Sequence, residues 1–107
     1  MRQKPFEIMR WESPSPPTLD FLTRMMTREG LQASQTELPA QSRSPEVKFE
    51  KTVVMVVASG QLQYAFPGYG VIDVDAGDIL EINPGVLYDV TVSSSEPAIL
   101  LQALREA

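Results

Sequence analysis

Few side chains in this 107-residue sequence are able to do chemistry, because it contains no cysteine and no histidine. That composition excludes disulfides, thiolate nucleophiles, Ser-His-Asp triads and the ligands that zinc, iron, nickel and copper prefer. Tyrosine and carboxylate side chains remain. Tyr88 and Asp89 are adjacent, but neighbours in a strand point to opposite faces, and a tyrosine of ordinary pKa, about 10, is a poor base at neutral pH. We therefore identify no catalytic residue.

Four carboxylates lie close together in the sequence, at Asp73, Asp75, Asp78 and Glu81. Their spacing matches no calcium-binding loop. Asp78 follows Gly77, a position at which aspartate accepts hydrogen bonds from the amides of a turn. Glu81 alternates with apolar neighbours, which is typical of a solvent-facing strand residue. We expect neither a bound metal nor a cofactor.

The charges are divided unevenly along the chain, whose formal net charge is −5. Residues 52–107 carry one basic side chain, Arg105, against seven acidic ones. Because binding to nucleic acid or to an anionic membrane rests on Lys and Arg contacts with phosphate, we expect neither partner. The sequence has no apolar run of about 18 residues, and its start lacks the layout of a signal peptide, so we expect a cytoplasmic protein.

One helix is predicted near the N-terminus. Residues 5–11 form a short mixed apolar segment, typical of a strand, which ends in a proline-rich stretch. Helical periodicity begins at Thr18 and Gly30 supplies a C-terminal stop, so the helix is expected over about residues 18–29. Its core-facing stripe consists of Leu19, Leu22, Met25 and Met26.

After Gly30 the hydrophobic period changes to two, which predicts strands. Residues 52–58 are β-branched on both faces, which predicts burial on both sides. Short strands at close spacing, with Gly, Pro, Asn and Asp turns between them, indicate a mainly β, antiparallel sandwich or barrel. The predicted strands cover residues 31–38, 47–49, 52–58, 61–66, 69–74, 79–82, 86–92 and 98–104, and residues 39–45 are predicted to form an exposed loop.

Two stretches of this β region resemble the two motifs of the cupin superfamily. Residues 77–88, Gly-Asp-Ile-Leu-Glu-Ile-Asn-Pro-Gly-Val-Leu-Tyr, resemble the second motif, in which a glycine, a proline, a second glycine and a metal-binding histidine follow at fixed spacing. Residues 47–60 resemble the first motif, and the whole resemblance covers about residues 31–104. It implies a cupin-type antiparallel jelly-roll barrel over residues 31–107. Residues 1–30 would then be a strand and helix extension packed on the barrel, within one structural domain.

The sequence departs from the cupin pattern at every position that would hold the metal. Counting from the motif glycines puts the paired histidine positions at Val47 and Phe49, the glutamate position at Val53 and the last histidine position at Tyr88. Two valines and a phenylalanine offer no donor atom to a metal. The resemblance therefore implies the barrel, whereas the residues themselves predict a metal-free interior.

Period two places further side chains on the same inner face as Val53 and Tyr88. The barrel interior is then either a filled core or an apolar pocket with a polar tip, and a pocket would have the few hundred cubic ångströms usual for small ligands. With no Lys or Arg between Lys51 and Arg105, it would favour a neutral ligand over phosphates or dicarboxylates. The predicted pocket residues are Val47, Phe49, Val53, Met55, Tyr64, Tyr88 and Val90.

Three functions fit these observations. The first is non-catalytic binding of a small, largely apolar organic ligand by a metal-free cupin barrel, as a sensor or carrier. The second is a metal-independent, isomerase-like enzyme with Tyr88 as acid, and the third is a purely structural or oligomerising domain with a filled barrel. We favour the first. We also expect a homodimer with the N-terminal segment in or beside the interface, because strand edges are usually covered and Trp11 is large for such a small monomer to bury.

Overall fold

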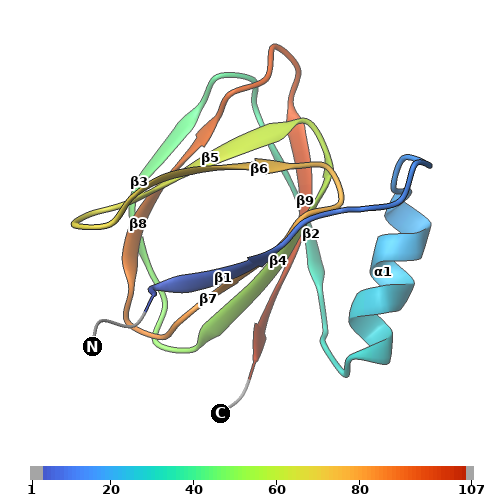
Figure 1. Ribbon diagram of the computed structural model, residues 1–107, viewed down its shortest axis with the longest axis horizontal. Coiled ribbons are helices and arrows are strands. Elements are labelled where there is room, and N and C mark those ends of the chain that lie inside the picture. Colours follow the sequence, from blue (N-terminus) through green and yellow to red (C-terminus); the bar gives the residue numbers. More distant parts are fainter. Residues whose placement is uncertain (1–3, 106–107) are drawn as a thin grey trace.

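The computed structural model describes residues 4–105 as two antiparallel β-sheets that face each other and enclose a barrel, with one helix outside it (Figure 1). This is the mainly β, jelly-roll architecture with an N-terminal helix that the sequence predicted. The elements are β1 (Phe6–Met9), α1 (Leu19–Arg28), β2 (Ser34–Leu38), β3 (Arg43–Lys48), β4 (Thr52–Ser59), β5 (Gln61–Phe66), β6 (Gly70–Asp75), β7 (Ile79–Ile82), β8 (Leu87–Val92) and β9 (Ala98–Arg105).

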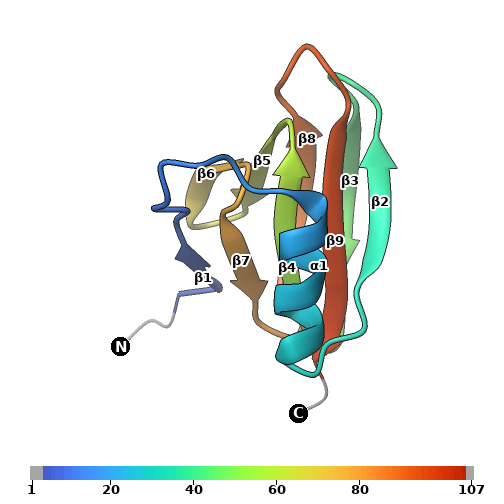
Figure 2. The same ribbon diagram turned by 90° about the vertical axis from the view of Figure 1, so that its right-hand side faces the viewer.

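The two sides of the barrel are closed differently. The strand order is β1-β7-β4-β9-β2 in the first sheet and β3-β8-β5-β6 in the second, and Figure 2 shows β1 and β6 on one side with β2 and β3 on the other. On the β1 side, Phe6 stacks on Phe66 with ring centroids 4.6 Å apart, and Tyr69 meets Phe6 edge-on at 5.3 Å. β2 and β3 contain no aromatic residue, so the side that they flank lacks this closure.

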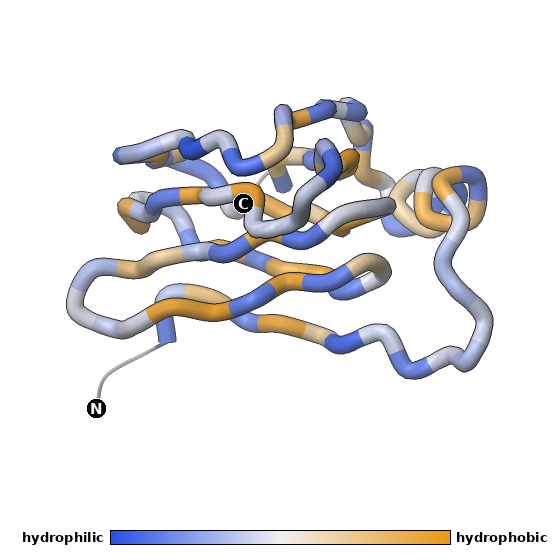
Figure 3. The backbone as a smooth tube through the Cα atoms, turned by 90° about the horizontal axis from the view of Figure 1, so that it is seen from above, coloured by the Kyte–Doolittle hydropathy of each residue, from blue (hydrophilic) through white to orange (hydrophobic). Residues whose placement is uncertain are grey.

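β4 lies in the middle of the first sheet and is buried on both faces. Val53, Met55 and Val57 face the barrel interior, whereas Val54 and Val56 face the helix. All five side chains are at most 3% exposed. The prediction of two-sided burial from the β-branched run is thus confirmed. Figure 3 shows the same concentration of hydrophobic residues along the strands, with a mostly hydrophilic connection between β1 and α1.

The helix α1 begins and ends at the residues that the sequence marks. The hydroxyl of Thr18 accepts a hydrogen bond from the Phe21 amide at 3.1 Å, which caps the first turn. Gly30, just beyond the helix, adopts φ +77°, a conformation that glycine takes without strain. Leu22 and Met26 are buried against the outer face of β4 and β9. The helix therefore shields one face of the first sheet.

One strand begins earlier than the sequence predicted. β3 starts at Arg43, whereas the strand was predicted only over residues 47–49 and residues 43–45 were assigned to a loop, so the prediction was wrong for those three residues. A bulge follows Ser44, and Glu46 within it adopts φ +55°. The Glu46 amide and the Arg43 guanidinium both donate to the Asp89 carboxylate on β8. The bulge removes the alternation of apolar and polar residues, which is the signal that predicts a strand.

The N-terminal segment contributes a strand to the barrel. β1 pairs with β7 along its length, from Phe6↔Ile82 to Met9↔Ile79, and Phe6 is 4% exposed in the barrel core. The region expected as a packed extension therefore includes one strand of the first sheet. Within residues 4–105, no helix is long and apolar enough to cross a membrane.

Candidate functional site

A cavity of about 150 Å³ opens on the β2 side of the barrel, between the inner faces of the two sheets. Its wall is mixed, with apolar side chains from both sheets and hydroxyl or amide groups among them. None of the residues of the described range 4–105 that line it is charged. The lining residues are Thr36, Leu38, Ser44, Val47, Phe49, Tyr64, Tyr88, Val90, Leu100 and Gln102.

Most of the predicted pocket residues lie around this cavity. Val47, Phe49, Tyr64, Tyr88 and Val90 line it. The other two predicted residues, Val53 and Met55, do not line it. Both belong to the same apolar core, but they are 1% and 0% exposed and pack against other side chains on every side.

Val53 and Met55 do not border the cavity because of the position of β4, the strand that carries them. β4 is flanked by β7 and β9, two strands away from the open edge at β2. The cavity instead lies against β9 and β2 in the first sheet, where Leu100 and Thr36 are register partners. The cavity is also smaller than the few hundred cubic ångströms that we expected, because core side chains from both sheets fill the rest of the barrel.

Two tyrosines supply hydroxyl groups to the cavity wall. Tyr64 on β5 and Tyr88 on β8 have ring centroids 5.6 Å apart, and each residue is 2% exposed. Neither hydroxyl has a hydrogen-bond partner within residues 4–105. Every side-chain nitrogen or oxygen atom in these residues that is fully buried does have a partner. The two hydroxyl oxygens are therefore not sealed in the core, and they reach the space of the cavity.

Burial controls the protonation of these phenols. Removal from water raises the pKa of Tyr88 to about 12. It raises the pKa of Tyr64 further, with a smaller contribution in the same direction from the neighbouring Tyr88. A buried phenol resists ionisation because the charged form loses its hydration. Both groups are thus neutral near pH 7, and each can donate one hydrogen bond and accept others.

Three more polar side chains at the cavity escaped the sequence prediction. The hydroxyls of Thr36 and Ser44 and the carboxamide of Gln102 line it, and none of them has a side-chain hydrogen bond within the described residues. Alternation in β9 carried a signal for one of them. Leu101 faces the helix and Leu100 faces the barrel, so Gln102 also faces the barrel.

The metal positions implied by the cupin resemblance do not fit a metal here. Val47, Phe49 and Tyr88 converge on the cavity and Val53 lies deeper in the core. The first two and Val53 present only carbon atoms, and a single phenol of raised pKa is a poor ligand. Across residues 4–105, no three His, Cys, Asp or Glu side chains come together in a way that could hold a metal ion.

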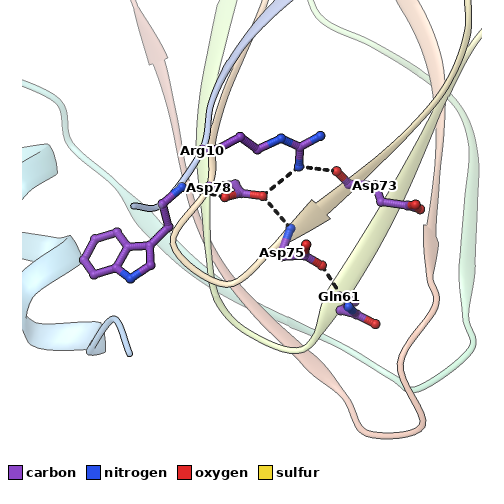
Figure 4. A network of polar contacts seen from close by, with 6 residues as sticks. Arg10, Gln61, Asp73, Asp75 and Asp78 are labelled. Atoms are coloured by element: carbon purple, nitrogen blue, oxygen red, sulfur yellow. Dashed lines mark hydrogen bonds and ion pairs between the residues drawn. The ribbon is translucent and has the colours of Figure 1, made fainter. Parts of the chain in front are cut away.

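The acidic residues form a structural network away from the cavity (Figure 4). Asp78 is 3% exposed, and its carboxylate accepts hydrogen bonds from the Arg10 guanidinium at 2.8 Å, the Trp11 amide at 2.8 Å and the Asp75 amide at 2.9 Å. Burial alone would raise the pKa of Asp78, but these three donors together lower it below its ordinary value of 3.8. Asp73 accepts from a glutamine side chain on β5 and stays on the exposed face. These residues tie the N-terminal segment to the barrel.

Trp11 is covered by its own chain. Its indole lies so close to Gly77 that a Cβ there would be 2.5 Å from the ring, and Gly77 has φ +91°. The ring of Phe21 on α1 meets the indole edge-on at 5.8 Å, and the indole N–H donates to the Ser15 carbonyl at 2.9 Å. Trp11 therefore needs no second subunit to bury it, which removes one argument for a dimer.

Comparison with known proteins shows which solved structures have a similar fold. The sequence matches no protein-family model and no curated protein. Among solved structures, the chain is similar to a DUF861 family protein from Thermotoga maritima, with 13% identity, a TM-score of 0.62 and coverage of 94% of this chain and 99% of that one. It is also similar to a cupin superfamily protein from Desulfitobacterium hafniense, with 13% identity, a TM-score of 0.61 and coverage of 99% and 83%.

A third solved structure, from a eukaryote, is similar to the chain to about the same degree. The Cnp3 cupin domain of Schizosaccharomyces pombe is 14% identical, with a TM-score of 0.60, and the match covers 94% of this chain and 60% of that one. Identities at this level report shared architecture. The two motif turns in the sequence, the two facing antiparallel sheets and these three structures lead to the same conclusion: the chain has the cupin fold.

Proposed function

We propose that this chain binds a small, neutral, largely apolar organic molecule in the cavity on the β2 side and does not transform it. The observation that carries this proposal is the set of five uncharged polar side chains around an otherwise apolar space. None of their polar groups has a protein partner within residues 4–105. A ligand with one hydrogen-bonding group would pair with some of them in place of water. The five are Thr36, Ser44, Tyr64, Tyr88 and Gln102.

The cavity limits the size and charge of the ligand. Its volume of about 150 Å³ equals that of an engineered apolar cavity in another protein that holds benzene. A single six-membered ring with one substituent is therefore the size that fits. A phosphate or carboxylate would lose its hydration there without meeting a positive charge, which is costly in free energy.

Binding is favoured over catalysis by the chemistry of the wall. The phenols of Tyr64 and Tyr88 have raised pKa values, so neither is a base near pH 7 and neither gives up its proton readily. Within the part of the chain that the structure describes, the wall contributes no carboxylate or ammonium group to share the proton. A sensor or a carrier needs only recognition, and recognition is what neutral donors and acceptors supply.

A titration with phenol followed by ¹⁵N–¹H NMR tests this proposal. Phenol has seven non-hydrogen atoms, and about −0.6 kcal/mol for each gives a Kd of about 1 mM. We expect saturable shifts in β2, β5, β8 and β9. Tyr88→Phe should weaken binding about fivefold, the equivalent of one lost hydrogen bond. Tyr69→Phe is the matched control, since Tyr69 is 49% exposed and does not line the cavity.

Two results would contradict the proposal. One is the absence of saturable shifts at 10-fold the expected Kd, or about 10 mM phenol. The other is an equal loss of affinity in Tyr88→Phe and Tyr69→Phe, which would show that phenol binds elsewhere. Either result would favour a purely structural or oligomerising domain over a ligand-binding one.

We further propose that the chain forms a homodimer with the N-terminal segment in or beside the interface. Met9 on β1 and Phe21 on α1 are 68% and 51% exposed, and β1 is an edge strand whose outer side is unpaired in the sheet order. Light scattering should give twice the chain mass of 11.9 kDa. Met9→Glu should shift it to the monomer, whereas Leu87→Glu on β8 should not. A monomer mass for the wild type would refute this.

A further inference from the structure

A second hollow adjoins the cavity. It has a volume of about 390 Å³ and lies at the outer end of the same opening, along β2 and the end of β9. Thr36, Phe49 and Gln102 line both hollows, so these residues form a shared wall. Farther out, the lining comes from Gln32 and Ser34 and from two residues near the end of β9, Ala103 and Leu104. We call this second hollow the outer groove.

The outer groove differs from the cavity in its chemistry. Gln32 and Ser34 are exposed, and within the described chain their side chains form no hydrogen bond, ion pair or ring contact. Among residues 4–105, no charged residue lines the groove. By contrast, Lys4 and Glu7 line a hollow near β1, and Glu29, Glu81 and Arg105 line the one beside α1. The opening on the β2 side thus offers amides, hydroxyls and the ring of Phe49 to a neutral group.

We propose that the outer groove is a second subsite, which takes a neutral, hydroxyl-rich group attached to the molecule whose ring occupies the cavity. This inference rests on the proposed function, because it assigns one ligand to both hollows. Hydroxyl groups pair with carboxamide and hydroxyl side chains without a charge penalty. A group linked to an already bound ring meets Gln32 and Ser34 at a high effective concentration, so weak hydrogen bonds there add to the affinity.

The geometry also explains why Phe49 lies at the boundary. It packs against the barrel core, and its carbonyl accepts the Gly85 amide at 2.8 Å, which fixes the backbone at that point. A ring placed in the cavity and a ring placed in the groove would both contact it. Phe49 is therefore the residue that separates the apolar head of the ligand from its polar tail.

Two probes with the same phenolic head test the second subsite. One is 4-methoxyphenol, and the other is 4-hydroxyphenyl β-D-glucoside, in which a sugar replaces the methyl group. We expect the glucoside to bind about tenfold more tightly, and methyl β-D-glucoside alone to show no measurable binding. Affinities are measured by calorimetry or by the NMR titration described above.

Variants confined to the outer groove complete the test. The double variant Gln32→Ala, Ser34→Ala should bring the glucoside to within about twofold of 4-methoxyphenol. Gln35→Ala is the matched control and should keep the full gain. Gln35 lies on the same strand, but its register partner is Leu101, which faces the helix.

The outcomes separate the two proposals. If 4-methoxyphenol binds and the glucoside binds no more tightly, or if its gain survives in the double variant, the second subsite is refuted and the cavity proposal stands. If neither phenol binds, the proposed function itself is refuted and the subsite with it. A gain that is lost in the double variant and kept in Gln35→Ala supports the subsite.

Discussion

Replacement of Asp78 by asparagine should destabilise the fold more than any other single charge removal along β6 and β7. The carboxylate is buried and accepts three hydrogen bonds, from Arg10, Trp11 and Asp75. Asparagine keeps one oxygen, which can still accept from the Trp11 amide. Its NH₂ group then faces the Asp75 amide and the Arg10 guanidinium, both of which are donors.

The expected loss in the free energy of unfolding follows from those contacts. A hydrogen bond to a charged group contributes about 1.5–3 kcal/mol, and a buried donor left without an acceptor costs about 1–3 kcal/mol. The side chain of Arg10 is 51% exposed, so its ion pair with Asp78 is screened and adds less. A loss of about 3 kcal/mol results, which corresponds to a fall in Tm of about 12–24 °C for a domain of this size.

Urea unfolding of Asp78→Asn and wild type provides the measurement. Trp11 is the one tryptophan of the sequence and donates to Asp78, so its fluorescence reports the N-terminal segment while circular dichroism reports the sheets. Asp73→Asn is the control, because Asp73 is exposed and its carboxylate accepts a single side-chain hydrogen bond, from Gln63. That change should cost less than about 0.5 kcal/mol. Equal effects of the two substitutions would refute the reasoning.

The same contacts predict a dependence on pH. Because the pKa of Asp78 is lower in the folded chain than its ordinary value of 3.8, the unfolded chain takes up the proton first as pH falls. The stabilisation by Asp78 is therefore complete above about pH 5 and declines as the pH falls through the folded pKa. The gap in stability between wild type and Asp78→Asn should be widest near neutral pH and should narrow in acid. A gap that widened in acid would contradict the assigned protonation.

Four further substitutions test separate parts of the structure by thermal or urea unfolding. Gly77→Ala should cost about 2–4 kcal/mol, because a Cβ would lie 2.5 Å from the Trp11 ring at a φ of +91°. Thr18→Ala removes the cap of α1 and should cost about 1 kcal/mol. Met55→Ala should cost about 2–5 kcal/mol, because the side chain is fully buried. Tyr88→Phe should change the free energy of unfolding by less than about 1 kcal/mol, since its hydroxyl has no hydrogen-bond partner in the described chain. A larger loss would indicate that the hydroxyl does have a protein partner.

Local signals were sufficient for most of the fold. Alternation between turn residues predicted β5 as Gln61–Phe66, the range that the structure shows, and the cap residues bounded α1 to within one residue at each end. The first half of β3 was missed because its bulge and Pro45 interrupt the alternation. Asp89, which is distant in the sequence, accepts hydrogen bonds at this bulge, and periodicity cannot report such contacts.

The candidate site shows a different limit. The cupin motif positions put Val53 and Tyr88 on the inner face of the barrel, and period two added Met55; all three lie in the barrel core. The inner face of a sheet, however, contains more residues than can border one cavity. Which inner residues border open space depends on the order of the strands across the sheet, and that order places β4 centrally and β2 at the edge. Gln102 could have been assigned to the interior from alternation in β9, because Leu100 faces the barrel.

The two sides of the barrel are closed to different degrees, and this difference explains where the cavity lies. Phe6, Phe66 and Tyr69 seal the β1 side with stacked and edge-on rings, so a small domain obtains a dry core there. On the β2 side the edge strand is exposed, and water can reach the inner face. Polar residues such as Thr36 and Gln102 are tolerated at that position only because water, or a ligand in its place, satisfies their hydrogen bonds. The residues that leave this side of the barrel open are thus the same residues on which the proposed binding of a ligand depends.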